Sequence, residues 1–280
     1  MSRIQDILAK AERDGTTRTT QPTTVAPSIV TRIPIPLTDS VLDTTPSIGP
    51  AGADLRGAPM TDVAPALRTA TATLHPALVS AIAPHSNAAE RYRSLRARIA
   101  QREELSPARV MAITSAGEGE GKSITAANLA LTMAQERHRN ILLVDANLRT
   151  PVVHSLFAID DRPGLSDVLS GAAALDDALV FLPELRLTVL PAGAIPEYPA
   201  ELLGSSAMRR VLDTLRTRFD RIVLDLPAVI PLADVGTVAP MVDGALVVVR
   251  VGTTQRPALD QTLAAFDDQK VLGVVLNETH

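Results

Sequence analysis

Residues 115–123 read Ser-Ala-Gly-Glu-Gly-Glu-Gly-Lys-Ser, a glycine-rich stretch that ends in a lysine and a hydroxyl. It follows an apolar run at 110–114 and precedes an Ala- and Leu-rich segment with helical periodicity, so a strand, a turn and a helix are expected in that order. Small residues let backbone N–H groups turn inward around a phosphate, and the N-terminus of the following helix adds partial positive charge. We therefore expect Lys122 to neutralise the β- and γ-phosphates of a nucleotide and the Ser123 hydroxyl to bind Mg²⁺.

The loop differs from the simplest form of this motif, because Ala116 occupies the position of the first glycine. A flexible glycine-rich connection without a ligand is the alternative interpretation, but the flanking strand and helix favour nucleotide binding. The chain has only three lysines among its 27 basic residues, so a lysine at this position favours a role for its compact ammonium group. The candidate nucleotide-binding residues of this segment are Gly117, Gly119, Glu120, Gly121, Lys122, Ser123 and Ile124.

Two other expected strands end in an aspartate. Asp145 ends the strand at 140–145, and Asp225 ends the strand at 220–225. Nucleotide hydrolases use carboxylates at strand ends to hold Mg²⁺, often through its water ligands, so both aspartates are candidate metal-organising residues together with Ser123. An aspartate after an apolar run can also cap a helix or a turn, but the glycine-rich loop favours the metal role for the pair.

The chain from about residue 86 alternates expected strands and helices, which is the pattern of an α/β domain. Several of the expected strands, such as 141–144 and 246–249, are apolar at every position, so both faces of a mostly parallel sheet should be covered by helices. The fold class is therefore a doubly wound α/β sheet, in which ligands bind beyond the carboxyl ends of the strands. The expected strands are 109–114, 140–145, 186–191, 220–225, 243–251 and 271–277, and the expected helices are 87–102, 122–137, 164–171, 174–180, 205–218, 234–240 and 256–267.

The first 85 residues differ in composition from the rest of the chain. Residues 1–15 carry apolar residues at helical spacing, which predicts a short amphipathic helix that either docks on a partner or frays as a terminus. Residues 16–85 are rich in Thr, Pro and Ala and contain ten of the 21 prolines, so we expect a disordered linker. Residues 86–280 are then expected to form the nucleotide-binding domain.

The bulk composition excludes several functions. A net charge of −4 and an aromatic content of 2% argue against a nucleic-acid surface, which needs a basic field or stacking platforms. The absence of cysteine excludes disulfides, thiolate metal sites and a thiol nucleophile. His138 and His154 have no partners at the spacing of metal ligands, so a histidine metal site is not expected. No apolar run reaches the ~18 residues of a membrane-spanning helix. We therefore expect a cytoplasmic protein that contacts a membrane only through a partner.

Further motifs, in order along residues 88–277, resemble the bacterial tyrosine kinases, the cytoplasmic autokinases of polysaccharide synthesis and export. Besides the glycine-rich loop, the matching pieces are Glu90-x-x-Arg93-x-x-Arg96, Val144-Asp145-x-Asn147-x-Arg149, Asp225-x-Pro227, and the segments at 164–166, 190–193, 199–203 and 274–277. The first 15 residues resemble the N-terminus of the subgroup encoded with exosortase-linked polysaccharide systems.

This resemblance implies a P-loop architecture related to that of the Min and Par ATPases, with ATP and Mg²⁺ as cofactors. It implies phosphoryl transfer to tyrosine, ATP-driven assembly or both, in the regulation of exopolysaccharide or capsule biosynthesis and export. The motif of Glu90, Arg93 and Arg96 resembles the family's ring-forming contact, although its spacing alone indicates a solvated arginine-rich face. The implied partner is a membrane protein of the chain-length-regulator type, as a separate chain, which would hold this protein at the inner membrane. Asn277, at the carboxyl edge of the sheet, corresponds to an amide that related folds place against adenine.

The chain departs from the family pattern in its candidate proton acceptor and in its tyrosines. Asn147 stands where the family usually has an acidic residue that is implied to accept the tyrosine proton, and an amide cannot take a proton near neutral pH. The family's C-terminal tyrosine cluster is absent from this sequence, which contains only Tyr92 and Tyr198. The candidate catalytic residues are Lys122, Asp145, Asp225 and Asn147.

These departures leave two alternatives open. One is an ATP-dependent switch or scaffold with weak catalysis, in which nucleotide binding drives assembly. The other is a partitioning ATPase of the Min/Par type, but such ATPases carry a lysine five residues before the loop lysine, where this chain has Gly117. ATP affinity with and without Mg²⁺ would separate a vestigial site from a working one.

Overall fold

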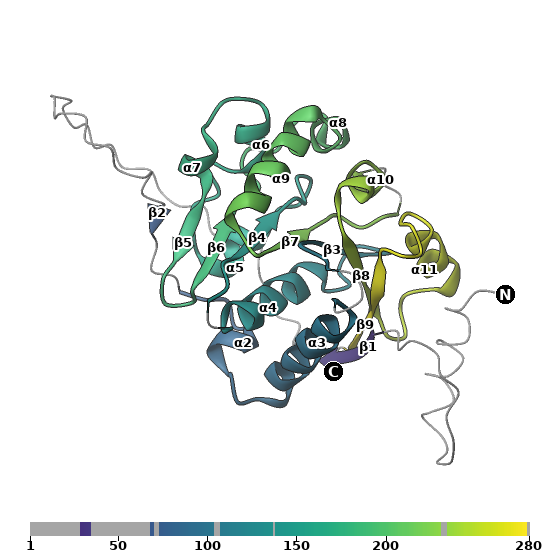
Figure 1. Ribbon diagram of the computed structural model, residues 1–280. Helices are drawn as coiled ribbons and strands as arrows, with labels where there is room; N and C mark the ends of the chain where they lie inside the picture. Colours follow the sequence, from purple (N-terminus) through teal and green to yellow (C-terminus); the bar gives the residue numbers. More distant parts are fainter. Residues whose placement is uncertain are drawn as a thin grey trace, which may run out of the picture.

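The computed structural model describes residues 29–34, 68–69, 73–103, 107–136, 138–230 and 234–278 (Figure 1). The six predicted strands are all present, as β3 (Val110–Ser115), β4 (Ile141–Asp145), β6 (Leu187–Leu190), β7 (Arg221–Asp225), β8 (Gly244–Arg250) and β9 (Val271–Glu278). Three short strands join them, namely β1 (Ile29–Pro34), β2 (Arg68–Thr69) and β5 (Val180–Leu182). The predicted α/β fold is confirmed.

The strands form one sheet in the order β1-β9-β8-β3-β7-β4-β6-β5-β2. Every neighbouring pair is parallel except β5 and β6, which run antiparallel. The chain moves from β3 to β4 on one side of β3, and later from β7 to β8 on the other side. The carboxyl ends of β3, β4 and β7 therefore meet at a topological switch point, which is where ligands bind in open α/β sheets.

Helices cover both faces of the sheet (Figure 1). The first face packs against α2 (Val79–Ile82), α3 (Asn87–Glu103), α4 (Lys122–Ala134) and α5 (Val153–Phe157). The second face packs against α6 (Leu165–Leu169), α7 (Leu175–Ala178), α8 (Pro199–Leu203), α9 (Ser206–Arg218), α10 (Asp234–Val238), the 3₁₀ turn Ala239–Met241 and α11 (Arg256–Leu263).

Alternation of side chains along each strand divides the core between these two layers. Met111 and Ile113 of β3 pack in the cluster that contains α3 and α4, whereas Val110 and Ala112 pack in the cluster that contains α9. Both layers are apolar because the strands are buried on both faces, as the continuous apolar runs predicted.

The predicted elements differ from the observed ones mainly at their ends and in the shortest pieces. The helix expected at 122–137 ends at Ala134, and the sequence did not indicate α2, α5, α8 or β5. The structure places β1, β2 and α2 within the range expected to be a linker, and the Ser80 N–H of α2 donates to Asn128 Oδ1 of α4 (2.9 Å). The helix expected over residues 1–15 lies outside the described residues. Within the described ranges, no helix has both the length and the apolar character needed to cross a bilayer.

Candidate functional site

The glycine-rich loop joins β3 to α4 at the carboxyl edge of the sheet (Figure 1). Gly119 (φ 73°) and Gly121 (φ 89°) lie in the left-handed region, which residues with a Cβ rarely adopt, so these two glycines allow the tight course of the loop. Lys122 and Ser123 form the first turn of α4, and both are largely buried. The lysine and the hydroxyl expected to bind phosphate and Mg²⁺ therefore lie at a helix N-terminus.

The remaining loop residues hold the loop closed. Ala116, at the position of the motif's first glycine, is buried without a positive φ, and its N–H donates to the Glu120 carboxylate (3.1 Å). Ser115 Oγ donates to the carbonyl of Gly117 (2.7 Å). Ile124 is partly buried and packs against the core cluster of α3 and α4. A methyl group at position 116 is thus compatible with the loop conformation.

Asp145 and Asp225 lie directly opposite each other in the parallel register of β4 and β7. Leu143 and Val223, two positions earlier on the same strands, pack in the cluster that contains α4. Since side chains alternate along a strand, both carboxylates point to the face on which α4 begins. The structure therefore brings the two aspartates together with the first turn of α4.

The two carboxylates differ in their hydrogen bonds. Asp145 Oδ1 accepts the N–H of Asn147 (3.1 Å), and Oδ2 accepts the N–H groups of Val152 (3.1 Å) and Val153 (3.0 Å). Asp225 is completely buried, and within the described ranges neither of its carboxylate oxygens has a hydrogen-bond partner. Burying a charged group without donors is costly, so Asp225 is the clearest sign that a cation belongs at this site.

Both aspartates hold protons more tightly than exposed carboxyl groups do. Burial raises the pKa of Asp145, and the charge of Asp225 raises it further, against the opposing effect of the backbone N–H groups. Burial also raises the pKa of Asp225, while the charge of the Lys122 ammonium lowers it. A divalent cation beside the pair would favour the charged form of both groups.

The donor set fits Mg²⁺. No group of three or more acidic, His or Cys side chains gathers anywhere in the part of the chain that the structure describes. Mg²⁺ is commonly bound by one or two carboxylates, a few waters and the oxygens of a phosphate substrate, rather than by a full cage of protein ligands. Asp145, Asp225 and Ser123 can supply the protein ligands of such a site.

Asn147 supports the loop that follows β4. Its Nδ2 donates to the carbonyl (2.9 Å) and to the hydroxyl (3.0 Å) of Thr150, and the residue is buried. Its backbone N–H donates to Asp145, so Asn147 helps to orient a candidate metal ligand. This geometry favours a positioning role for Asn147 over direct contact with a tyrosine hydroxyl.

Arg149 and Asp234 form an ion pair that sequence reasoning missed. Arg149 Nε and Nη2 donate to the two Asp234 oxygens (2.5 and 3.0 Å), and Asp234 is completely buried. Asp234 begins α10, so the pair joins the loop after β4 to the segment that follows β7. The only signal in the sequence is one aspartate inside an apolar stretch, which does not identify its partner.

Glu120 and Asn277, both expected to contact the nucleotide, are hydrogen-bonded to each other. Asn277 Nδ2 donates to the backbone carbonyl of Glu120 (3.0 Å), and Asn277 Oδ1 is buried with no partner among the described residues. The Glu120 carboxylate accepts a hydrogen bond from Thr254 Oγ1 (2.6 Å), in the turn after β8. Thr254 was not indicated by the sequence. These contacts fix the glycine-rich loop to the ends of β8 and β9.

The motif of Glu90, Arg93 and Arg96 lies on α3. Arg93 Nε and Nη2 donate to Glu90 Oε2 (2.8 and 2.6 Å), and Nη1 donates to the carbonyl of Pro84 (2.6 Å). Arg96 Nη1 donates to the carbonyl of Thr132, near the far end of α4 (2.5 Å). Both arginines are therefore engaged within the chain, and Glu90 is the most exposed member of the motif.

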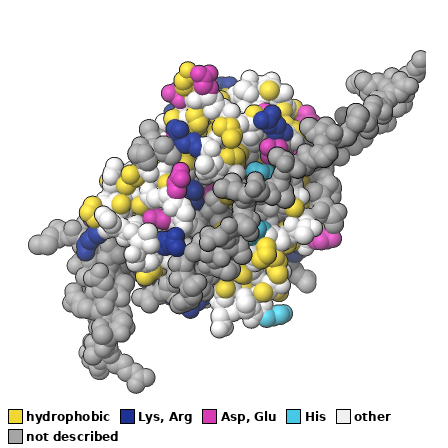
Figure 2. Space-filling model, turned by 180° about the vertical axis from the view of Figure 1, so that it is seen from behind, with side chains coloured by type: hydrophobic (Ala, Val, Ile, Leu, Met, Phe, Trp, Pro, Cys, Tyr) yellow, Lys and Arg dark blue, Asp and Glu magenta, His cyan; other side chains and the backbone are white. Residues whose placement is uncertain are grey.

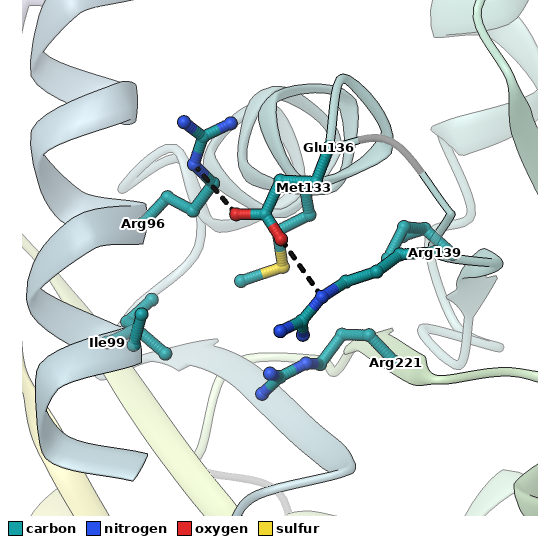
Figure 3. A pocket seen from close by; sticks show the side chains of 8 residues that line it. Arg96, Ile99, Met133, Glu136, Arg139 and Arg221 are labelled. Atoms are coloured by element: carbon teal, nitrogen blue, oxygen red, sulfur yellow. Dashed lines mark ion pairs between the residues drawn. The ribbon is translucent and has the colours of Figure 1, made fainter. Parts of the chain in front are cut away.

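Arg96 also belongs to a cluster of charges at the far end of α4. Figure 3 shows Arg96 and Arg139 pairing with the two oxygens of Glu136 (3.2 and 3.1 Å), with Arg221 beside the same small cavity. The cluster links α3 to the end of α4, whose other end carries the glycine-rich loop. An intersubunit contact through Arg96 would have to share this arginine with Glu136.

Proteins with similar sequences include a tyrosine kinase and a polysaccharide biosynthesis transport protein, although no protein-family model matches the chain. This chain is 35% identical to the tyrosine-protein kinase YwqD of Bacillus subtilis over 196 residues. The aligned region covers 69% of this chain and 82% of YwqD. This chain is 37% identical to the succinoglycan biosynthesis transport protein ExoP of Rhizobium meliloti over 202 residues. That aligned region covers 70% of this chain and 26% of ExoP. The solved kinase domain of the Escherichia coli tyrosine kinase ETK has a TM-score of 0.68 at 25% identity, over 72% of this chain and 80% of that domain.

Proposed function

Because the chain belongs to the bacterial tyrosine kinase family, we propose that it binds Mg-ATP at the carboxyl edge of the sheet and transfers the γ-phosphoryl group to tyrosine. The observation that carries this proposal is the pair of buried carboxylates, Asp145 and Asp225, directly opposite each other beside the glycine-rich loop. The name of ExoP, a succinoglycan biosynthesis transport protein, supports a role for this chain in regulating exopolysaccharide or capsule biosynthesis and export.

Each part of the site has a role in this proposal. Lys122 neutralises charge on the β- and γ-phosphates, and the backbone N–H groups of the loop surround them. Ser123, Asp145 and Asp225 hold Mg²⁺, which supplies charge neutralisation at the phosphates when it is bound. The buried Oδ1 of Asn277 accepts a hydrogen bond from the adenine amino group. Phosphoryl transfer depends mostly on positioning and charge, and these are the contributions that the set can make.

A catalytically weak ATP-dependent switch is the second candidate, and the surroundings of Asn147 favour it. The amide hydrogens of Asn147 are donated to Thr150, and an amide cannot accept the proton of a substrate hydroxyl. In this version ATP binding drives assembly of the protein, and ATP hydrolysis releases it. The two versions share the nucleotide site and differ only in whether phosphotyrosine accumulates.

The proposal extends to partners of the chain. Self-association would use α3, where the Glu90 side chain is 62% exposed and the Arg93 side chain is 28% exposed. A membrane protein of the chain-length-regulator type, as a separate chain, would hold the kinase at the cytoplasmic side of the inner membrane. Mass photometry with and without Mg-ATP tests the assembly, and Glu90→Ala is expected to leave monomers in both conditions.

Two measurements test the proposed function. Calorimetric titration with ATP should detect binding that is strengthened by Mg²⁺ and lost in Lys122→Ala. Lys270→Ala is the matched control, because Lys270 donates to the carbonyls of Ala239 and Pro240 (both 3.1 Å), away from the site. Mass spectrometry after incubation with Mg-ATP then separates the versions, since phosphotyrosine supports the kinase and ATP hydrolysis without it supports the switch. Absence of ATP binding by the wild-type chain would overturn both.

A further inference from the structure

The two tyrosines of the sequence differ in exposure. Tyr92 lies within α3 and is completely buried against α4, and burial raises the pKa of its hydroxyl above the ordinary value. A nucleotide bound to another molecule cannot reach this hydroxyl while the domain is folded. Tyr198 is 61% exposed and directly precedes α8, at the end of the loop that leaves β6. Tyr198 is therefore the tyrosine that can present its hydroxyl to an active site.

The loop that carries Tyr198 is fixed to its own domain on both sides. Ser166 Oγ donates to the carbonyl of Ala194 (2.5 Å), and the Ser166 N–H donates to the carbonyl of Ala192 (2.8 Å), so α6 holds the first part of the loop. On the other side, Pro199 is buried at the start of α8. These contacts hold Tyr198 in an exposed position at the start of α8. In this position a nucleotide held by a second copy can approach its hydroxyl.

The Glu197 carboxylate lies beside this hydroxyl. Tyr198 Oη donates to Glu197 Oε1 (2.8 Å), and this hydrogen bond raises the pKa of Tyr198. A phenol that attacks phosphorus must lose its proton, and Glu197 can accept it. Asn147 cannot, because it is an amide. Ile195, in the same loop, is 64% exposed and offers apolar surface for contact with another protein.

We propose that Tyr198 is the phosphoryl acceptor of this chain and that it receives the phosphoryl group from ATP bound to a second copy, with Glu197 as proton acceptor. This inference rests on the proposed kinase function. A bond forms between Tyr198 Oη and the γ-phosphorus, and the bond from that phosphorus to the β,γ-bridging oxygen breaks. ADP leaves with the electron pair of this bond, and the phenolic proton passes to Glu197 and then to solvent.

Site mapping by mass spectrometry is the first test. The full chain is incubated with Mg-ATP, and phosphopeptides are located in the wild type, in Tyr198→Phe and in Tyr92→Phe. The wild type and Tyr92→Phe should each carry one phosphate, at Tyr198, and Tyr198→Phe should carry none. Tyr92→Phe is a matched control, because both variants lose only a tyrosine hydroxyl. Thermal unfolding of each variant shows that it is folded.

A mixing experiment tests transfer between copies. Lys122→Ala, which keeps Tyr198 but lacks the phosphate-binding lysine, is combined with Tyr198→Phe, which keeps the site but lacks the acceptor. The two chains differ in mass, so the phosphate can be assigned, and it should appear on Lys122→Ala only in the mixture. Glu197→Gln should slow phosphorylation of Tyr198 about a hundredfold. Glu184→Gln, which changes an exposed glutamate in the turn before β6, is the matched control and should have little effect.

Other outcomes overturn the proposal in distinguishable ways. Phosphate on Tyr92, or on Tyr198→Phe at the wild-type level, would refute Tyr198 as the acceptor. Wild-type protein that binds and hydrolyses ATP without phosphate on Tyr198 would also refute it, while leaving the nucleotide site of the proposed function intact. Phosphate on Tyr198 that does not appear in the mixture would refute transfer between copies. Failure of the wild type to bind ATP would remove the proposed function and this inference together.

Discussion

Replacement of Asp225 by asparagine is expected to stabilise the nucleotide-free protein and to remove its response to Mg-ATP. Asp225 is completely buried, no described residue donates to its oxygens, and burial raises its pKa from 3.8 to about 6. A tenfold change in proton affinity corresponds to about 1.4 kcal/mol. Keeping Asp225 ionised therefore costs the folded state about 3 kcal/mol above pH 6.

The sign of the effect follows from proton binding in the two states. Folded Asp225 holds its proton more tightly than the unfolded chain does, so wild-type stability falls as pH rises from about 4 to about 6 and stays low above that. Asparagine has no proton to lose, so Asp225→Asn should gain about 3 kcal/mol over the wild type between pH 4 and pH 8. For a domain of this size, the gain is a rise of roughly 6 to 12 °C in Tm.

Thermal unfolding at pH 4, 6 and 8 in EDTA measures this gain, and a second series contains Mg-ATP. A ligand at 100 times its Kd adds about 2.7 kcal/mol to a protein that binds it. The wild type should gain this stability and Asp225→Asn should not, so the advantage of the variant should nearly close. A variant that is less stable than the wild type in EDTA at pH 8, or that responds equally to Mg-ATP, would refute the reasoning.

Asp243→Asn is the matched control with the opposite sign. Burial acts to raise the pKa of Asp243, but hydrogen bonds from Arg216 (2.8 and 2.9 Å) and from the Val110 N–H (2.7 Å) outweigh it and hold the pKa below its ordinary value. The ionised form of Asp243 therefore stabilises the folded state. This substitution should lower Tm at neutral pH, and the loss should fade as the pH falls below about 4.

Three further predictions test contacts around the site. Thr254→Val should weaken Mg-ATP binding about tenfold in calorimetry, because the turn after β8 loses its hydrogen bond to the glycine-rich loop, whereas Thr254→Ser should bind as the wild type does. Arg149→Ala should lower the free energy of unfolding in urea by about 2 kcal/mol, because it leaves Asp234 buried without its ion partner, and an unchanged urea midpoint would contradict this. Gly119→Ala should lower the free energy of unfolding by about 1 kcal/mol, because Gly119 has a positive φ. Gly236→Ala in α10, where a Cβ has equal space, should raise the free energy of unfolding slightly. Equal Tm changes in the two variants would exclude backbone strain as the cause of the loss in Gly119→Ala.

The parts of the fold that could be predicted from the sequence are those that local pattern determines. Continuous apolar runs located six strands to within about two residues, and the glycine-rich loop identified the carboxyl edge of the sheet. The elements that were missed, α2, α5, α8, β1, β2 and β5, have only two to six residues each. Such pieces are too short to show a hydrophobic period, and packing against the rest of the protein stabilises them.

The site was predictable only where one segment carries the signal. Lys122, Ser123 and the two strand-end aspartates each follow a recognisable local pattern, and the structure brings them together. The roles of Thr254 and Asp234 depend on contacts between residues 134 and 85 positions apart, which no local pattern encodes. Asn147 is an intermediate case. Its amide side chain already excludes proton acceptance in the sequence, but its hydrogen bonds to Thr150 could be found only in the structure.

Because Asp145 pairs directly with Asp225, the register of β4 and β7 sets the relative positions of the two carboxylates of the metal site. A single-residue insertion or deletion within β4 or β7 would rotate a carboxylate to the opposite face and bring a neighbouring aliphatic side chain into its position. Insertions and deletions should therefore be tolerated better in the crossovers between strands than in β4 or β7. An engineer who transplants this site to another scaffold should copy the two strands in register and is free to redesign their connections.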